Sequence, residues 1–107
     1  MTKITFFKKK DLIIGFEVFG HTGKANRGED LLCAQLSTVA QLAVVGVEDV
    51  ANVQNFHEIS DGYLKITVSD KDAEKEKIQF LFDTCLQSFK SIILNEEKYA
   101  KLEVKNV

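Results

Sequence analysis

One segment near the C-terminus limits the possible folds of this chain more than any other feature. Charged residues crowd positions 71–77, and after them apolar residues recur at positions 78, 81, 82, 85, 89, 92 and 93. At about 100° per residue these positions share one face of a helix. A helix with one apolar face must bury that face against another layer. The segment therefore predicts a helix, capped by Ser69 or Asp70, that lies on a sheet.

Five segments are expected to form that sheet. Residues 2–8, 12–19 and 98–104 alternate apolar and more polar side chains. Residues 55–60 and 63–69 are strand-like and are joined by Asp61-Gly62, a strong hairpin signal because both turn positions are expected to take positive φ. Between the first two strands, Lys8-Lys9-Lys10-Asp11 is typical of a solvated hairpin tip, the other interpretation being a substrate-steering patch.

A second apolar-periodic segment predicts another helix, from Leu31 to Val45. Asp30 is a good N-cap and Gly46 a natural stop, while residues 47–54 are ambiguous, one interpretation being another short turn of helix followed by a loop. The expected order is β-β-α-β-β-α-β. This is an α+β layered domain, with a mostly antiparallel sheet and two helices that cover one or both of its faces. A length of 107 residues predicts a single domain spanning 1–107.

Composition and patterning argue against several functional classes. Fourteen basic against sixteen acidic side chains give a net charge of −2, without the basic face of a nucleic-acid-binding protein. The longest apolar run, Leu31 to Val45, is shorter than the roughly 18–20 residues of a membrane helix and is interrupted by polar residues, so no membrane helix is expected. The N-terminus begins with strand-like alternation instead of a signal peptide, which predicts a cytoplasmic protein with reduced thiols. The cysteines have no metal-site spacing, and neither a metal nor a cofactor is expected.

The first cysteine lies where a helix start would activate it. With Asp30 as N-cap, Cys33 is the third helical residue, near backbone N–H groups without acceptors and the positive end of the helix dipole. Both favour a thiolate. Cys33 lies at the border of the apolar face, one turn before Ser37, which suits a reachable nucleophile; the other interpretation is an apolar filler. Cys85, within the apolar stripe of the other helix, is expected to be a core residue.

One of the two histidines lies in a loop that can bring it to Cys33. His21 belongs to a stretch from Gly20 to Gly28, which is expected to be a flexible surface loop because it holds Gly20, Gly23 and Gly28. If the loop folds back, the imidazole can take the thiol proton and later give it to a leaving amine. Asp30 either orients His21 or only caps the helix. His57, within a predicted strand, is expected to have a surface or structural role.

These residues also form a recognisable pattern. Gly20-His21-Thr22, followed by Gly28-Glu29-Asp30-Leu31-Leu32-Cys33-Ala34-Gln35-Leu36-Ser37, resembles the GHA…GxDxxCAxxS signature of the bacterial ribosomal-processing cysteine proteases called Prp. The expected elements follow the family's order over essentially the whole chain. Thr22 stands where alanine is usual, and Ala100 stands where proline often follows the tyrosine. Neither departure removes a catalytic group.

The resemblance implies a homodimeric cysteine endopeptidase. Its substrate would be the precursor of large-subunit ribosomal protein twenty-seven, from which it removes a short N-terminal extension after a hydrophobic, aromatic-containing segment. On this resemblance Cys33 matches the nucleophile, His21 matches the general base, and Asp30 and Ser37 match supporting positions. Two alternatives stay open: a noncatalytic ribosome-associated binding module with the same fold, and a thiol-dependent hydrolase or transferase acting on a small acyl substrate.

The helical wheel adds an independent reason to expect a dimer. Phe80 falls about 180° from the apolar stripe of its helix, on a face otherwise made of polar side chains, and Leu94 has a similar azimuth. Two large apolar side chains are therefore expected to be exposed on the outer face. A twofold contact would bury the same patch on both partners.

Overall fold

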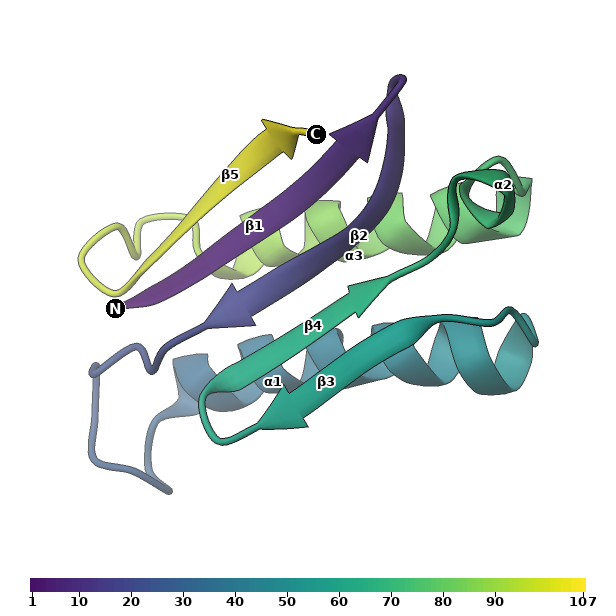
Figure 1. Cartoon of the computed structure of the whole chain (residues 1–107). Coiled ribbons are helices and arrows are strands. Elements are labelled where there is room, and N and C mark those ends of the chain that lie inside the picture. The colour runs from purple at the N-terminus through teal and green to yellow at the C-terminus, as the bar shows by residue number, and fades with distance from the viewer.

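The computed structural model describes residues 1–107 and shows a five-stranded sheet with both long helices behind the same face (Figure 1). The strand order is β3-β4-β2-β1-β5, and neighbouring strands are antiparallel except β1 and β5, which are parallel. The α+β class and the order β-β-α-β-β-α-β are thus confirmed. The elements are β1 (Thr2–Lys9), β2 (Leu12–Phe19), α1 (Leu31–Val45), η1 (Gly46–Val50), β3 (Phe56–Ser60), β4 (Tyr63–Thr67), α2 (Asp70–Ala73), α3 (Glu76–Ile92) and β5 (Ala100–Asn106).

Aromatic side chains from the central strands form the core beneath α3. Phe6 of β1 and Phe16 of β2 are directly paired across the strands, and their rings stack with centroids 4.9 Å apart. Phe89 of α3 meets both rings edge-on, at 5.9 and 5.5 Å. Cys85 is buried on the same face of the helix. The apolar stripe of this helix therefore covers the sheet as its sequence predicts.

The first helix does not end at Gly46, contrary to expectation. Gly46 keeps helical angles, φ −62° and ψ −45°, and the chain continues through the π-helical segment η1. Val47 is fully buried, so continuation of the helix adds a side chain to the core. The glycine serves close packing instead, because a Cβ there would lie 2.6 Å from Cδ2 of Leu81 on α3.

This continuation makes the apolar helix longer than the sequence suggests. Leu31–Val50 has 20 residues and a mean hydropathy of 1.5, enough by length and composition to cross a membrane. The expectation that no apolar run is long enough is therefore wrong. Core helices of soluble proteins meet the same criterion, and this helix buries one face in the domain with Leu32, Leu36, Ala40, Ala43, Val44 and Val47. Even so, only 33% of its most apolar window is buried, which leaves apolar surface outside the core.

The second long helix begins later than predicted. Ser69 caps the short helix α2 by accepting a hydrogen bond from the Asp72 N–H at 3.1 Å, and the chain then breaks before α3. Gln79 bridges this break, since its side-chain amide donates to the carbonyl oxygens of Ala73 at 2.8 Å and Ile13 at 2.7 Å. The Ala73 carbonyl at the end of α2 therefore has a side-chain hydrogen-bond partner. Because of this bond, residues 71–77 do not have to form one continuous helix to satisfy that carbonyl.

The hairpin turns also differ from expectation. Gly62 has φ +69°, but Asp61 does not take positive φ. The turn with two positive values is Lys10-Asp11, at +53° and +65°, where β1 and β2 are joined by only two residues. That conformation matches the twist of the flanking strands, although it has a steric cost for residues other than glycine. Lys8-Lys9-Lys10-Asp11 thus forms a hairpin tip, and Lys9 makes an ion pair with Asp70 at 2.8 Å.

Candidate active site

Cys33 occupies the first turn of α1, as the sequence predicts. Asp30 is the N-cap, with extended angles φ −87° and ψ 97°, and its Oδ1 accepts a hydrogen bond from the Cys33 N–H at 2.9 Å. The thiol is partly exposed. It therefore combines access to solvent with the positive end of the α1 dipole, two conditions that favour a reactive thiolate.

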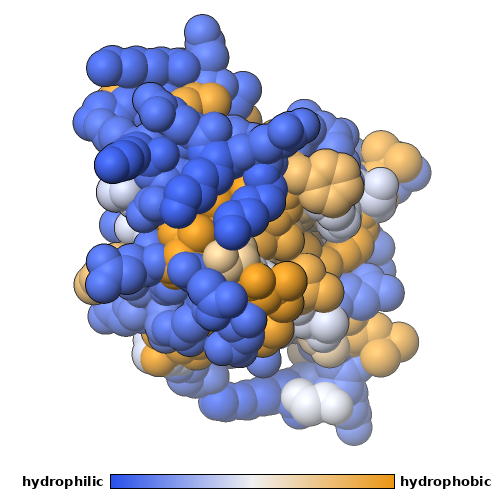
Figure 2. Space-filling view, turned by 90° about the vertical axis from the view of Figure 1, so that its right-hand side faces the viewer, coloured by the Kyte–Doolittle hydropathy of each residue, from blue (hydrophilic) through white to orange (hydrophobic).

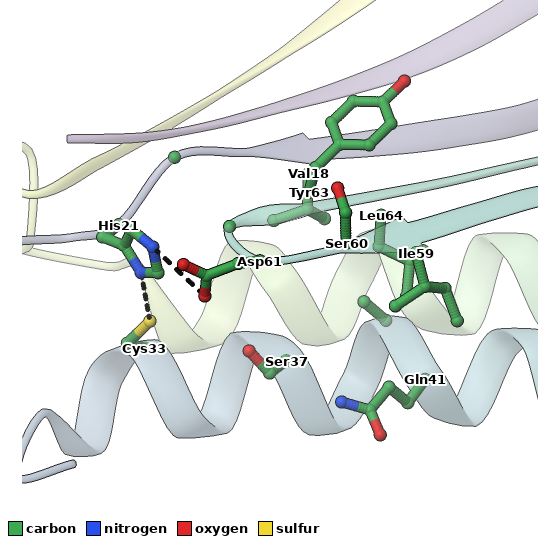
Figure 3. A pocket seen from close by; sticks show the side chains of 13 residues that line it. Val18, His21, Cys33, Ser37, Gln41, Ile59, Ser60, Asp61, Tyr63 and Leu64 are labelled. Carbon is green, nitrogen blue, oxygen red and sulfur yellow. Dashed lines mark hydrogen bonds and ion pairs between the residues drawn. The ribbon is translucent and has the colours of Figure 1, made fainter. Parts of the chain in front are cut away.

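The β2–α1 loop folds back and brings His21 to this thiol. The distance from His21 Nδ1 to Cys33 Sγ is 3.9 Å (Figure 3). Two contacts fix the backbone just before the histidine: the Gly20 N–H donates to the Gly62 carbonyl at 2.7 Å, and the Thr2 hydroxyl donates to the Gly20 carbonyl at 3.1 Å. Strand β1 and the β3–β4 turn thus anchor the base, while α1 carries the thiol.

Gly62 lies against the imidazole itself. A Cβ at this position would be 2.8 Å from His21 Nε2 and 3.2 Å from Cδ2. Positive φ and this close approach both require glycine there. The Asp61-Gly62 turn therefore shapes the site as well as closing the β3–β4 hairpin, a role the sequence pattern does not reveal.

Asp61, the other residue of this turn, is also near His21 and was not predicted from the sequence as a site residue. Its Oδ1 is 3.8 Å from His21 Nε2, the ring nitrogen that does not face Cys33 (Figure 3). The same oxygen is 2.8 Å from Arg27 Nη2 in the loop. The sequence shows a carboxylate in the Asp61-Gly62 turn, but not that this turn lies beside the end of β2, which leads into the His21 loop. That proximity follows only from the pairing of β2 with β4.

Asp30 caps α1 and holds the β2–α1 loop, and it does not orient His21, because its hydrogen bonds go to other residues. Its carboxylate accepts hydrogen bonds from the Thr22 hydroxyl and from the N–H groups of Lys24, Ala25 and Cys33. These bonds, that of Thr22 foremost, hold the pKa of Asp30 below its usual 3.8. Thr22, where the related signature has alanine, is buried and adds a hydroxyl contact inside the loop.

The loop between β2 and α1 is tied down at two further points. Gly20, Gly23 and Gly28 have positive φ, which allows its sharp changes of direction. Lys24 pairs with Glu96 at 2.6 Å and lies over the ring of Tyr99, and Arg27 pairs with Asp61. In this structure the glycine-rich loop from Gly20 to Gly28 is therefore held in place, mainly by ion pairs near the surface.

Two cavities meet at the Cys33–His21 pair. One, of about 220 Å³, lies between α1 and the β3–β4 hairpin and has an apolar part formed by Val18, Ala40, Ile59 and Leu64. The other, of about 430 Å³, lies between α1 and the loop. Ser37 lines both of them, one turn after Cys33. An extended chain crossing the thiol would have a cavity on each side.

The other cysteine and histidine lie elsewhere. Cys85 is buried in the core, and this burial raises the pKa of its thiol to about 11. His57 is exposed on β3, with Nδ1 2.8 Å from the side-chain oxygen of Asn55. No group of three or more His, Cys, Asp or Glu side chains is placed to hold a metal ion. The chemistry-bearing residues that come together are thus Cys33, His21 and Asp61.

A thiol at a helix start, an imidazole beside it and an open groove across both are the arrangement of a cysteine protease. The cysteine protease Prp family matches residues 1–101, and the chain belongs to this family. A search of curated proteins found no significant match.

Solved structures agree in fold. The chain is 28% identical to SMU.848 from Streptococcus mutans, covering 100% of this chain and 96% of that one with a TM-score of 0.82. It is 19% identical to the essential ribosomal processing protease Prp from S. aureus, in complex with a covalently linked product peptide, covering 98% and 100% with a TM-score of 0.89. The same protease with a substrate peptide is 18% identical, with the same coverage and a TM-score of 0.84.

Proposed function

We propose that this chain is a ribosomal-processing endopeptidase in which Cys33 is the nucleophile and His21 the general base. Its substrate is the precursor of large-subunit ribosomal protein twenty-seven, from which it removes the short N-terminal extension. The observation that carries the proposal is the 3.9 Å contact between His21 Nδ1 and Cys33 Sγ at the meeting point of two cavities. Family membership supports the reaction class, and the S. aureus relative is described as a ribosomal processing protease.

The reaction follows from the two side chains. His21 Nδ1 accepts the thiol proton, and the Cys33 thiolate attacks the carbonyl carbon of the scissile peptide bond. The protonated imidazole then gives its proton to the departing amine, leaving an acyl group on the sulfur that water removes. The first-turn N–H groups of α1 that lack intrahelical acceptors provide positive potential for the developing oxyanion. The Cys33 N–H already donates to Asp30, so it mainly holds the helix start.

The cavity between α1 and the hairpin supports a preference for an apolar segment. Val18, Ile59 and Leu64 provide an apolar surface, while Ser37 and Gln41 provide polar groups on the α1 side. An aromatic or aliphatic side chain next to the scissile bond can bury its surface there, and the polar groups can bind the peptide backbone. This arrangement suits cleavage after a hydrophobic segment.

Incubation with the precursor protein tests the proposal directly. Mass spectrometry should find the precursor shortened at one position by the wild-type chain and unchanged by Cys33→Ala. Cys85→Ala is the matched control, because it removes the other thiol and should still cleave. A precursor that binds with micromolar affinity and stays intact with the wild-type chain would contradict the protease proposal and favour the noncatalytic binding module. A cytoplasmic location, where thiols stay reduced, suits an enzyme that needs free Cys33.

We also propose that two copies of the chain associate through the outer face of the helices. The sequence of α1 contains no charged residue, and Leu31, Leu42 and Val45 are exposed on it. Phe80 of α3 is 75% exposed and Leu94 is 71% exposed. Figure 2 shows the molecule from the end at which α1 continues into η1, and hydrophobic surface gathers there at the centre and right of the view. A helix without a charged face usually has a partner, and a second copy offers the same uncharged surface.

A further inference from the structure

The two ring nitrogens of His21 face different groups. Nδ1 is 3.9 Å from Cys33 Sγ, and Nε2 is 3.8 Å from Asp61 Oδ1. The Asp61 carboxylate belongs to the β3–β4 turn, whose glycine contacts the same ring, so the hairpin borders His21 with both residues of its turn. Asp61 is 62% exposed, and the site supplies no other role for it besides its ion pair with Arg27.

A carboxylate on this side of the ring has two chemical consequences. A neutral imidazole carries its proton on one nitrogen only. A carboxylate acceptor at Nε2 keeps the proton there, which leaves the lone pair of Nδ1 directed at the thiol. After Nδ1 has taken the thiol proton, the ring is a cation, and the carboxylate stabilises that cation.

We propose that Asp61 is a positioning residue for His21, and that Arg27 competes with His21 for the Asp61 carboxylate. The inference rests on the proposed function of the site. It adds Asp61 to the pair Cys33 and His21, and it makes Arg27 the residue that controls whether the Asp61 carboxylate is free to contact His21. Asp61 touches neither substrate nor thiol; it acts through the imidazole.

The competition follows from the geometry of the loop. Arg27 Nη2 is 2.8 Å from Asp61 Oδ1, a full ångström closer than His21 Nε2. The Arg27 side chain is exposed, so the pair is screened by solvent and opens easily. Arg27 also lines the 430 Å³ cavity between α1 and the loop, and a peptide entering that cavity displaces it. The freed carboxylate then closes the distance to Nε2 as substrate arrives.

Few charged or titratable groups surround the His21 ring. Cys33 faces the ring from α1, and Asp61 faces it from the β3–β4 turn. Arg27, Glu29 and Asp30 of the loop line the cavity to which the ring also belongs. Asp30 is held by its four hydrogen bonds to the loop and helix start, so Asp61 is the carboxylate free to change partners.

Nitrogen-15 NMR of the imidazole rings tests the tautomer without any substrate. The wild-type chain should show His21 with its proton on Nε2. Asp61→Ala should shift the ring toward the Nδ1–H tautomer, whereas Asp61→Asn should keep it on Nε2, because the amide oxygen still accepts. His57 is the internal reference, and Glu58→Gln, on the same hairpin, is the matched control; neither should show a change.

Kinetics supply the second readout. Asp61→Ala should lower kcat about tenfold with KM within about twofold, since a charge-assisted hydrogen bond to an exposed carboxylate is lost, and Asp61→Asn should recover part of the loss. Arg27→Gln should increase the proportion of the Nε2–H tautomer of His21, and this effect should vanish in the Arg27→Gln, Asp61→Ala double variant. An unchanged tautomer of His21 in Asp61→Ala would overturn the inference, even if the chain cleaves its substrate. Because NMR needs no cleavage, a failure of the protease proposal would be recognised separately.

Discussion

Replacement of Gly62 by alanine should press directly on the imidazole of His21. A Cβ at position 62 would lie 2.8 Å from Nε2, whereas ordinary van der Waals contacts of a Cβ begin at 3.4 Å. The ring must therefore move or turn by about 0.6 Å or more. The Gly20 N–H bond to the Gly62 carbonyl holds the backbone beneath it, so the side chain takes up most of the movement.

Two effects of different size follow from this substitution. Alanine at φ +69° costs about 1–2 kcal/mol of folding free energy, because the left-handed region is unfavourable for a residue with a Cβ. Displacement of the ring changes the 3.9 Å contact between His21 Nδ1 and Cys33 Sγ. Since a 1 Å misplacement of a catalytic group can cost about 10²-fold, kcat should fall by about tenfold or more.

Gly23→Ala is the matched control. Gly23 has φ +72°, close to that of Gly62, but no atom lies within 4 Å of its Cβ position. Thermal unfolding should show a similar loss of stability in both variants, while steady-state cleavage of a precursor-derived peptide should fall only in Gly62→Ala. Equal activity in the two variants would refute the reasoning, because backbone strain alone would then account for every effect.

Other substitutions and conditions have equally definite outcomes. Cys33→Ala should abolish cleavage and leave the circular dichroism spectrum unchanged; retained cleavage would exclude this nucleophile. His21→Ala should lower kcat by about 10²–10⁴-fold and His57→Ala should change it little, and the reverse ranking would show the wrong base. The lowered pKa of Asp30 means that its bonds are complete above its usual 3.8 and are lost as pH falls through the folded value, so the NMR shift of the Cys33 amide should stay constant above pH 3.8 and move below it. Light scattering should give about 24 kDa, twice the chain mass, and Phe80→Glu should give monomers; a wild-type monomer, or a dimeric Phe80→Glu, would contradict the proposed interface.

The sequence was sufficient for elements whose side chains follow a simple period. The apolar stripe on α3 and the apolar–polar alternation of β1 and β2 each indicate one buried face. In the structure the apolar face of α3 packs against the apolar face of these strands. Its failures lie where a distant contact overrides a local rule. Gly46 is compatible with ending a helix, but here it is a glycine because Leu81 packs against it. Burial of Val47 in the core favours continuation of the helix beyond it. Neither contact is visible in the segment itself.

The site divides in the same way. Cys33 could be located because an N-cap and a helix start are local features, and the loop histidine could be paired with it by chain length alone. Asp30 offered two interpretations, and only its bonds to Thr22, Lys24 and Ala25 distinguish them. Asp61 could not be found, because its approach to His21 depends on which strand lies beside β2. Strand order is a property of the assembled sheet.

Activation of Cys33 by His21 is tested most directly by the rate of iodoacetamide alkylation at each cysteine as a function of pH. Cys85 is the internal reference, because burial raises its pKa to about 11 and keeps it unreactive in the folded chain. In the wild-type chain Cys33 should react rapidly well below about pH 8.5, the ordinary range of a free thiol, and His21→Ala should lose this reactivity. A free-thiol profile at Cys33, the same in the wild-type chain and in His21→Ala, would contradict the catalytic pairing of these two residues.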